Sequence, residues 1–471
     1  MTRRRAVIIP SVLLSFSLSL SLGAVAVAAQ AVGDTAHESP TSVSVSRASA
    51  SGQHAESVVA AIERSAHTLK TTSPEGSLRD LDALGRMVRN AKVVGLGEAT
   101  HGSQDFFRMK HRVFRYLVEE KGFRSFSLEL PWSSGVRLND YVLDGKGDLK
   151  DIAREEFQGS YRIWNNQDYI DLIEWMRDYN IEHPHDPVRF MGNDMGYAGP
   201  ELYERVVDQV SREYPRLLER VTELYRGLPP TTDAGSYYAQ YLQLPLAERK
   251  ERAERTRKVY ELLRKQRPAA GADKQDHAWT VQHARAIHQM AEGFSFDITD
   301  ETQIPEMMKY RDQVMAENVA WWHKHTGDRI LLSAHNTHVS YDSFDVRYPK
   351  TQGAFLRDAL GTGYLSIGFS FYKGSFAAFG ADDDVMRTYS VGAAKPGTNE
   401  HTLDKARRRD FILDMRTAPD SARAWLDKER VTWNIGAGWP DPTQYTTALG
   451  RAHDVLIHLH DVNATKYLGT P

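Results

Sequence analysis

Short apolar runs and amphipathic segments alternate in the first half of the chain. Residues 92–96 and 123–129 are apolar runs of strand length. Between them, residues 105–121 carry apolar side chains on one helical face, and Gly122 follows as a stop signal. A strand, a helix and a second strand in this order predict parallel pairing of the two strands through a right-handed crossover.

Later apolar runs extend this prediction. Two amphipathic helices are expected ahead of the first strand, at residues 56–69 and 78–90. Further strands of the same sheet are predicted at residues 188–191, 329–333, 364–371 and 455–459. The fold class that follows is α/β, with a mostly parallel sheet core flanked by helices.

The pattern changes between residues 200 and 326. Long, charged helices are predicted here, at residues 202–225, 246–267 and 274–292. No period in the chain indicates an internal repeat. We interpret residues 200–326 as a helical insertion, or cap, on an α/β domain that spans residues 55–471.

The first 29 residues have the three parts of a secretory signal peptide. Arginines occupy positions 3–5, residues 6–27 are mostly apolar, and small residues around Ala28 offer a cleavage site. A transmembrane anchor is the alternative, but the segment is short and ends in small residues rather than in a basic stop. Residues 30–54 are rich in Ser, Thr, Ala and Gly without an apolar period, which predicts a flexible linker. We therefore expect a secreted, extracellular protein.

Composition narrows the class of function. The formal net charge is −3 over 471 residues. Loss of the three signal-peptide arginines would make it more negative, which argues against nucleic acid as a partner. The chain has no cysteine, so thiolate nucleophiles and thiolate metal sites are excluded. A folded part of this length buries a core large enough to be stable without disulfides.

Residues 93–102 carry the strongest chemical signal. Their apolar run is broken by Gly97, and Glu98 and His101 follow before Gly102. This pattern predicts a strand that ends in a tight turn and holds both side chains at its carboxyl end, which is the edge where ligands bind in open α/β sheets. We expect the loop to be too short to bury them, which disfavours a purely structural role.

Better-known motifs do not fit this segment. Thr100 stands where a dinucleotide-binding fingerprint needs its third glycine, and Glu98 would repel a pyrophosphate. Gly97 and Gly102 have the spacing of a phosphate-binding loop, but its lysine is missing. Neither His-Glu-x-x-His nor Gly-x-Ser-x-Gly occurs in the chain, so a zinc-protease motif and a serine nucleophile elbow are both excluded.

Acidic residues and histidines follow the other predicted strands as well. Glu129 ends the second strand, Asp194 follows a third, and His335 and His338 follow a fourth. The carboxyl ends of parallel strands meet at one edge of a sheet, so we expect these groups to lie near the Glu-x-x-His turn. Carboxylates and imidazoles are suited to general acid–base catalysis, which contributes roughly 10²–10⁴-fold to a rate.

Several of these residues also have a structural interpretation. Glu129 could pair with an arginine, Asp194 could cap a turn, and His335 could be a buried, hydrogen-bonded packing histidine. His458 and His460 alternate with apolar residues near the C-terminus, as on one face of a strand, and we expect them to be structural.

The turn sequence Gly-Glu-x-x-His-Gly of residues 97–102 resembles the active-site motif of the erythromycin esterase family, which hydrolyses macrolide lactones. Further segments resemble family blocks in the family order, at residues 123–131, 311–318 and 334–338. The resemblance runs from about residue 58 to residue 467. It implies an α/β core with a helical cap and a water-activating histidine, His101.

The resemblance also implies roles for individual residues. Glu98 would orient His101, and the catalytic set would be completed by Glu129, His335 and His338. Lys110 stands at the place of a family arginine. Our candidate substrate-binding residues are therefore Lys110 and Asp194.

The predicted activity is hydrolysis of an ester or a macrolide lactone by water that His101 activates, with His335 or His338 as a cationic donor to the oxyanion. This scheme uses no cofactor. A metal-dependent hydrolase is the alternative, because Glu98, His101, Glu129 and His338 are also credible ligands for a divalent ion. A catalytically inactive, secreted binding protein is a further alternative. The expected partner is a small-molecule ester or lactone, with neither nucleic acid nor a stable membrane association.

Overall fold

The computed structural model describes residues 57–268 and 274–469. The predicted signal peptide (1–29) and the predicted linker (30–54) lie outside the described residues. Within the two described ranges, no helix has both the length and the apolar character that a membrane crossing requires.

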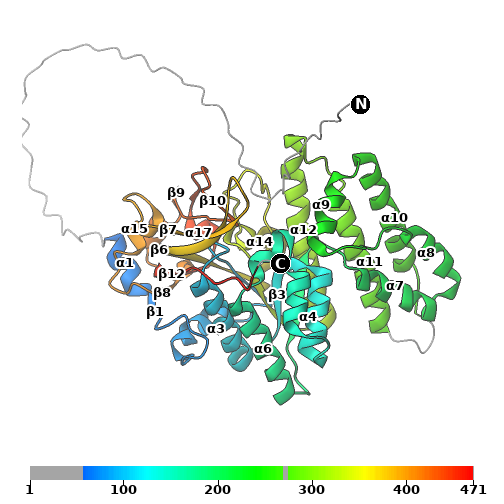
Figure 1. Cartoon of the computed structure of the whole chain (residues 1–471). Coiled ribbons are helices and arrows are strands. Elements are labelled where there is room, and N and C mark those ends of the chain that lie inside the picture. Colours follow the sequence, from blue (N-terminus) through cyan, green and yellow to red (C-terminus); the bar gives the residue numbers. More distant parts are fainter. Residues whose placement is uncertain (1–56, 269–273, 470–471) are drawn as a thin grey trace, which may run out of the picture.

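Ten of the strands in the described ranges form one sheet at the centre of the fold (Figure 1). Its main path is β1-β8-β12-β6-β2-β5-β3-β4, and neighbours from β12 to β4 pair in parallel. The strand bounds are β1 His67–Thr68, β2 Val93–Leu96, β3 Phe123–Pro131, β4 Arg189–Asp194, β5 Arg329–Ser333, β6 Tyr364–Gly380, β7 Met386–Val391, β8 Phe411–Asp414, β10 Gly438–Trp439 and β12 Val455–Val462. The predicted α/β class with a mostly parallel sheet is confirmed.

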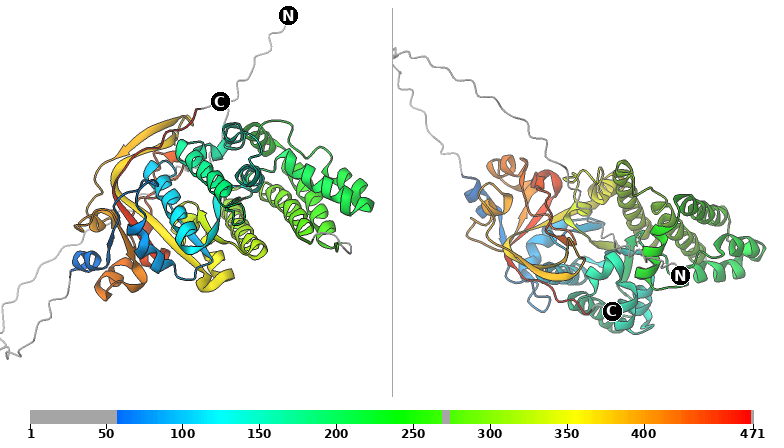
Figure 2. Two further views of the ribbon diagram at one scale, coloured as in Figure 1. Left: turned by 90° about the horizontal axis from the view of Figure 1, so that it is seen from below. Right: turned by 45° about the horizontal axis from the view of Figure 1, so that its top comes forward.

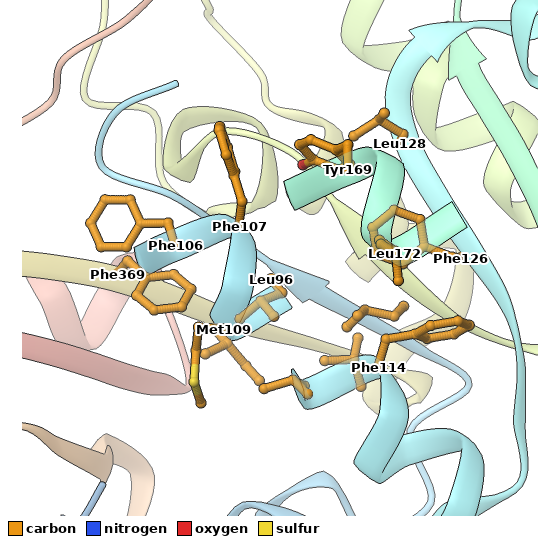
Figure 3. Packing of buried hydrophobic residues seen from close by; sticks show 14 of the residues in the cluster. Leu96, Phe106, Phe107, Met109, Phe114, Phe126, Leu128, Tyr169, Leu172 and Phe369 are labelled. Carbon is orange, nitrogen blue, oxygen red and sulfur yellow. The ribbon is translucent and has the colours of Figure 1, made fainter. Parts of the chain in front are cut away.

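Helices cover both faces of this sheet because side chains alternate along each strand. Leu331 of β5 packs on one face with α3 and α6, whereas Ile330 and Leu332 pack on the other with α12 and α14. Figure 3 shows the first face, where aromatic side chains of α3, α6 and β3 meet. The bounds of these helices are α3 Gln104–Lys121, α6 Gln167–Glu182, α12 Ile304–Thr326 and α14 Gln352–Leu360.

Helix α3 begins and ends where its sequence predicts. The Ser103 hydroxyl accepts a hydrogen bond from the Phe106 N–H, which caps the first turn. Gly122 ends the helix in the left-handed region at a φ of 68°, which a glycine adopts without strain. The Glu-x-x-His turn is thereby held between the end of β2 and the first turn of α3.

The segment between β4 and β5 consists mainly of helices, and most of them stand to one side of the sheet (Figures 1 and 2). Their bounds are α7 Pro200–Glu213, α8 Leu218–Tyr225, α9 Ala234–Gln243, α10 Leu246–Arg264, α11 Lys274–Gly293 and α12 Ile304–Thr326. Pro215 divides the predicted helix 202–225 into α7 and α8, because proline lacks the N–H that a continuous helix needs.

Other predicted elements also differ from the structure in type or extent. The predicted helix 56–69 ends at Ser65 (α1 Val58–Ser65), because the next residues pair as β1 with β8. The predicted helix 78–90 begins as a 3₁₀ turn and is α-helical only over Asp82–Val88 (α2). The predicted strand 364–371 continues to Gly380, because β7 and β10 pair with its second half.

The remaining elements lie in segments for which no element was predicted. Helices follow β3, β5, β7, β8 and β11, with bounds α4 Trp132–Asp144, α5 Leu149–Glu156, α13 Asn336–Val339, α15 Asn399–Leu403, α16 Asp420–Leu426 and α17 Leu449–Ala452. Two short strands, β9 Arg430–Val431 and β11 Thr446–Thr447, pair with each other apart from the main sheet.

Candidate active site

The Glu-x-x-His turn is wedged between β6 and α13. A Cβ atom on Gly97 would lie 2.1 Å from Oδ1 of Asn336, and one on Gly102 would lie 1.8 Å from the carbonyl oxygen of Ala377. Neither position has room for a side chain, which explains the two glycines. The neighbouring elements close over the turn, so that the side chains between the glycines are buried. Our expectation that this loop was too short to bury them is therefore wrong.

Glu98 lies at the centre of a buried chain of hydrogen bonds. Its Oε1 accepts from Nδ1 of His101 at 2.6 Å, and its Oε2 pairs with the ammonium group of Lys110. Lys110 also donates to Oγ of Ser333 at 2.9 Å and to the carbonyl of Ala334 at 3.3 Å. A carboxylate is tolerated at this depth because both of its oxygens are paired.

Lys110 has no exposed surface and does not line the site cavity. Burial lowers the pKa of its ammonium group, and the Glu98 carboxylate opposes that shift. The expected substrate-binding role of Lys110 does not agree with this placement. Its position on α3, behind Glu98, suits it instead to holding that carboxylate in place.

The hydrogen bond to Glu98 determines how the His101 ring presents its nitrogens. A carboxylate only accepts, so the proton of the neutral ring lies on Nδ1 and the lone pair on Nε2. Nε2 has no hydrogen-bond partner among residues 57–268 and 274–469, and His101 lines the cavity. The rings of Trp164 and His335 flank it, with centroids at 5.3 and 4.8 Å. His101 therefore offers one basic nitrogen to the cavity.

Arg311 of α12 joins two acids that lie near the carboxyl ends of different strands, Glu129 of β3 and Asp194 of β4. Its Nη2 donates to Oε1 of Glu129 at 2.8 Å and to Oδ2 of Asp194 at 2.5 Å, and its Nε donates to Asp194 at 3.0 Å. The hydroxyl of Tyr161 adds a hydrogen bond to Asp194 at 2.9 Å. The arginine pairing considered for Glu129 thus occurs, and both acids still line the cavity.

His338 lies between two carboxylates. Nδ1 donates to Oδ1 of Asp312 at 2.9 Å, and Nε2 lies 3.3 Å from Oε1 of Glu129. Burial lowers the pKa of His338, but Asp312 and Glu129 together raise it well above its ordinary value, so the ring is an imidazolium. Burial in turn raises the pKa of Glu129, but the charges of His338 and Arg311 hold it well below its usual range.

His335 is a neutral ring. Its Nε2 donates to the carbonyl of Ile435 at 3.2 Å, and its Nδ1 lies 3.1 Å from the hydroxyl of Thr337. Burial, and the nearby His101 and His338, keep the pKa of His335 well below its ordinary value. His335 is therefore not the cationic donor that the sequence analysis allowed, and its backbone N–H instead donates to Glu129 at 3.1 Å.

These groups border one cavity of about 410 Å³. The five predicted residues that line it are His101, Glu129, Asp194, His335 and His338. The other two, Glu98 and Lys110, do not line it and form the support of His101. Leu242, Phe294 and Ile298 add an apolar wall from the helical segment between β4 and β5.

A sequence profile of the erythromycin esterase family matches residues 118–462. This chain belongs to that family. Erythromycin esterase type II of Escherichia coli is 23% identical over 356 residues, which cover 72% of this chain and 83% of the relative. A crystal structure of a Bacillus cereus protein is similar at a TM-score of 0.80 and 28% identity, covering 88% of this chain and 98% of that chain. A mutant of the erythromycin esterase EreC in its open conformation has the same fold, at a TM-score of 0.67 and 17% identity over 86% of this chain and 99% of that chain.

Sequence reasoning missed three residues of this family member's site. Arg311 and Asp312 fall in a block that resembles the family, but they lie within a helix and not after a strand, so no role was assigned to them. Trp164 lies in a 3₁₀ turn, packs edge-on against His101, and donates from Nε1 to the carbonyl of Glu129 at 2.8 Å. A lone tryptophan in a turn carries no local signal of such a role.

Of the four side chains considered as metal ligands, all except His101, whose Nε2 has no partner among the described residues, are already paired through the atoms that would bind an ion. Glu98 is held by Lys110, Glu129 by Arg311, and both nitrogens of His338 face carboxylates. Across the described part of the chain, no group of three or more His, Asp or Glu side chains is arranged to hold a metal ion. This pairing favours acid–base chemistry at the cluster over the metal-dependent alternative.

Proposed function

We propose that this family member hydrolyses an ester or a lactone with a water molecule that His101 activates. The observation that carries the proposal is the 2.6 Å hydrogen bond from Nδ1 of His101 to the buried Glu98, which leaves Nε2 as the basic nitrogen. Membership of the erythromycin esterase family supports a hydrolase. Water as the nucleophile agrees with the lack of cysteine and of a serine nucleophile elbow.

The reaction needs two proton transfers at one nitrogen. Water loses a proton to Nε2 of His101 as its oxygen bonds to the acyl carbon, and the carbonyl becomes an oxyanion. Glu98 stabilises the imidazolium that forms. The oxyanion then collapses, the bond between the acyl carbon and the alcohol oxygen breaks, and the departing oxygen takes the proton back from Nε2. The products are an acid and an alcohol, joined in one chain when the substrate is a lactone.

Arg311 is the donor that we assign to the oxyanion. Its Nη1 lies 3.4 Å from Nε2 of His338. The raised pKa of His338 favours its imidazolium form, in which both atoms are N–H donors and Nη1 keeps its hydrogens for an acceptor in the cavity. Arg311 also lines that cavity. Fixed N–H donors of this kind stabilise a developing oxyanion without reorganising.

The walls of the cavity favour a bulky, partly apolar substrate. The apolar wall lies in the same cavity as the charged cluster around Arg311. A macrolide lactone is consistent with both surfaces, and the Escherichia coli relative is an erythromycin esterase. We further propose that the enzyme acts outside the cell on a small-molecule substrate, on the strength of the N-terminal signal pattern.

The test is an activity screen of the purified protein against macrolides and simple esters, followed by mass spectrometry in water enriched with oxygen-18. We expect a product heavier by one water, with the label in the new carboxylate. Tight binding without turnover across both panels would contradict the proposal and favour the inactive binding protein.

A further inference from the structure

Residues near the C-terminal end of the described range pair with the two loops that carry His101 and Trp164. β12 ends at Val462, and residues 463–468 after it form no helix; we call this segment the C-terminal strap. Two isolated bridges pair it antiparallel with the rest of the protein, Ser103 with Ala464 and Asn166 with Tyr467. The strap therefore joins two loops that are more than 60 positions apart in the sequence.

The first loop is the Glu-x-x-His turn. The N–H of Thr465 donates to the carbonyl of Gly102 at 2.9 Å, and the N–H of Gln104 donates to the carbonyl of Asn463 at 2.9 Å. Gly102 directly follows His101, so these two bonds hold the backbone on the C-terminal side of the imidazole. The strap thus limits how far that turn moves relative to the sheet.

The second loop carries the tryptophan that flanks His101. The N–H of Leu468 donates to the carbonyl of Asn165 at 2.9 Å, and the hydroxyl of Thr465 donates to Asp168 at 3.0 Å. Asn165 directly follows Trp164, whose ring lies edge-on to the imidazole. One segment therefore sets the spacing between the His101 turn and the ring that packs against it.

Tyr467 brings the strap to His101 itself. Its ring packs against the apolar core that α3 and α6 form with the sheet. Its hydroxyl lies 3.5 Å from the carbonyl oxygen of His101. Burial raises the pKa of Tyr467, so the hydroxyl stays protonated and faces that carbonyl as a donor. Thr465, which makes the shorter bonds, is buried.

We propose that the C-terminal strap positions His101 for catalysis, with Thr465 and Tyr467 as its positioning residues. The inference rests on the proposed function, because it gives a role to the base assigned there. Only Nδ1 of the imidazole is anchored by a hydrogen bond among the described residues, so the place of Nε2 depends on the turn and on Trp164. A misplacement of about 1 Å at a reacting group lowers a rate by roughly 10²-fold.

Two truncations form the matched test. A chain that ends at Val462 loses the strap, whereas a chain that ends at Leu468 keeps it. We expect the longer chain to have the wild-type kcat. The shorter chain should lose roughly 10-fold or more in kcat with little change in KM, because the cavity walls stay in place while the base moves. A folded short chain with the wild-type kcat would overturn the proposal.

Point variants test the same idea if the shorter chain does not fold. Thr465→Val removes the bond to Asp168, and Tyr467→Phe removes only the hydroxyl near His101. We expect both to lower kcat several-fold and to leave KM nearly unchanged. Tyr237→Phe is the control, since its hydroxyl also donates to a backbone carbonyl, that of Leu228 at 3.2 Å, and neither residue lines the cavity. Full kcat in both strap variants would overturn the proposal.

A spectroscopic readout separates this inference from the proposed function. The proton between Nδ1 of His101 and Glu98 should give a downfield NMR resonance, assigned by its loss in His101→Ala. We expect this resonance to shift or broaden in the shorter truncation, or in Tyr467→Phe, and to stay unchanged in Tyr237→Phe. An unchanged resonance in the strap variants would refute the strap proposal even if the protein hydrolyses none of the esters tested.

Discussion

Nδ1 of His101 and Oε1 of Glu98 lie 2.6 Å apart, and Glu98 has no exposed surface. The second oxygen of this carboxylate is held by the equally buried Lys110. The imidazole is therefore oriented by an acid that solvent does not reach, and that acid is neutralised by a cation from the following helix. Water competes with neither contact.

The buried Lys110–Glu98 pair predicts a large stability effect. Lys110→Met leaves Glu98 buried without its cation, which we expect to lower the free energy of unfolding by about 3–5 kcal/mol. The double variant Glu98→Gln with Lys110→Met should recover much of that stability, because no uncompensated charge remains, but it should stay slow in turnover. Urea unfolding and kcat measure the two effects. Wild-type stability in Lys110→Met would contradict the buried pair.

The charges around Glu129 predict how stability depends on pH. The pKa of His338 is raised above its ordinary value of 6.5, so its contribution is complete below pH 6.5 and is lost as the pH rises through the folded-state pKa. The pKa of Glu129 is lowered below 4.5, so its contribution is complete above pH 4.5 and is lost as the pH falls through the folded-state pKa. Together they stabilise the fold most between these two values.

The variant His338→Gln tests whether protonated His338 stabilises the fold and whether this contribution is lost as the pH rises. The difference in Tm between wild type and variant should be largest below pH 6.5 and should shrink as the pH rises above it. Thermal unfolding followed across this range measures the difference. Two curves that stay parallel throughout would show that His338 carries no extra proton in the folded protein.

Much of the fold was predictable because its signals are local. The unit β2-α3-β3 follows from two apolar runs around an amphipathic helix with a glycine stop. The second half of β6 was not predicted, and the residues of β1 were predicted to be helical, because both strands depend on pairing with β7, β10 and β8 from distant segments. Hydrophobic periodicity does not report such partners.

The site was predictable where its residues end parallel strands, since strand topology brings those ends together. The role of Arg311 was not predicted, because this residue lies within a helix and reaches the site only through tertiary packing. The burial of Glu98 was not predicted for the same reason, since it depends on a lysine in the second turn of α3. The charge states of His335 and His338 depend on carbonyl and carboxylate partners that spacing does not reveal.

The paired state of the acids predicts the response to chelators. Exhaustive chelation should leave the hydrolytic rate nearly unchanged, because Glu98 and Glu129 are neutralised by side-chain cations of this chain. Activity and metal content are measured on the same sample before and after treatment. Loss of activity that one added divalent ion restores, with stoichiometric metal in the purified protein, would support the metal-dependent alternative.

The signal pattern predicts export and processing. We expect cleavage near Ala28 or Ala29 and recovery of the shortened chain from the medium. N-terminal sequencing of the recovered protein identifies the site. A membrane-bound product that still begins with Met1 would contradict export as a processed protein.

The most direct test of the mechanism is the hydrolytic rate of His101→Ala, compared with His458→Ala. His458 is also buried, and its Nδ1 lies at hydrogen-bond distance, 2.8 Å, from the hydroxyl of Ser370. It does not line the cavity, so His458→Ala should reduce the stability of the protein more than its activity. His101→Ala should fold and lose roughly 10²-fold or more in kcat, as expected for removal of a general base. A folded His101→Ala protein that hydrolyses its substrate at the wild-type rate would contradict the proposed mechanism.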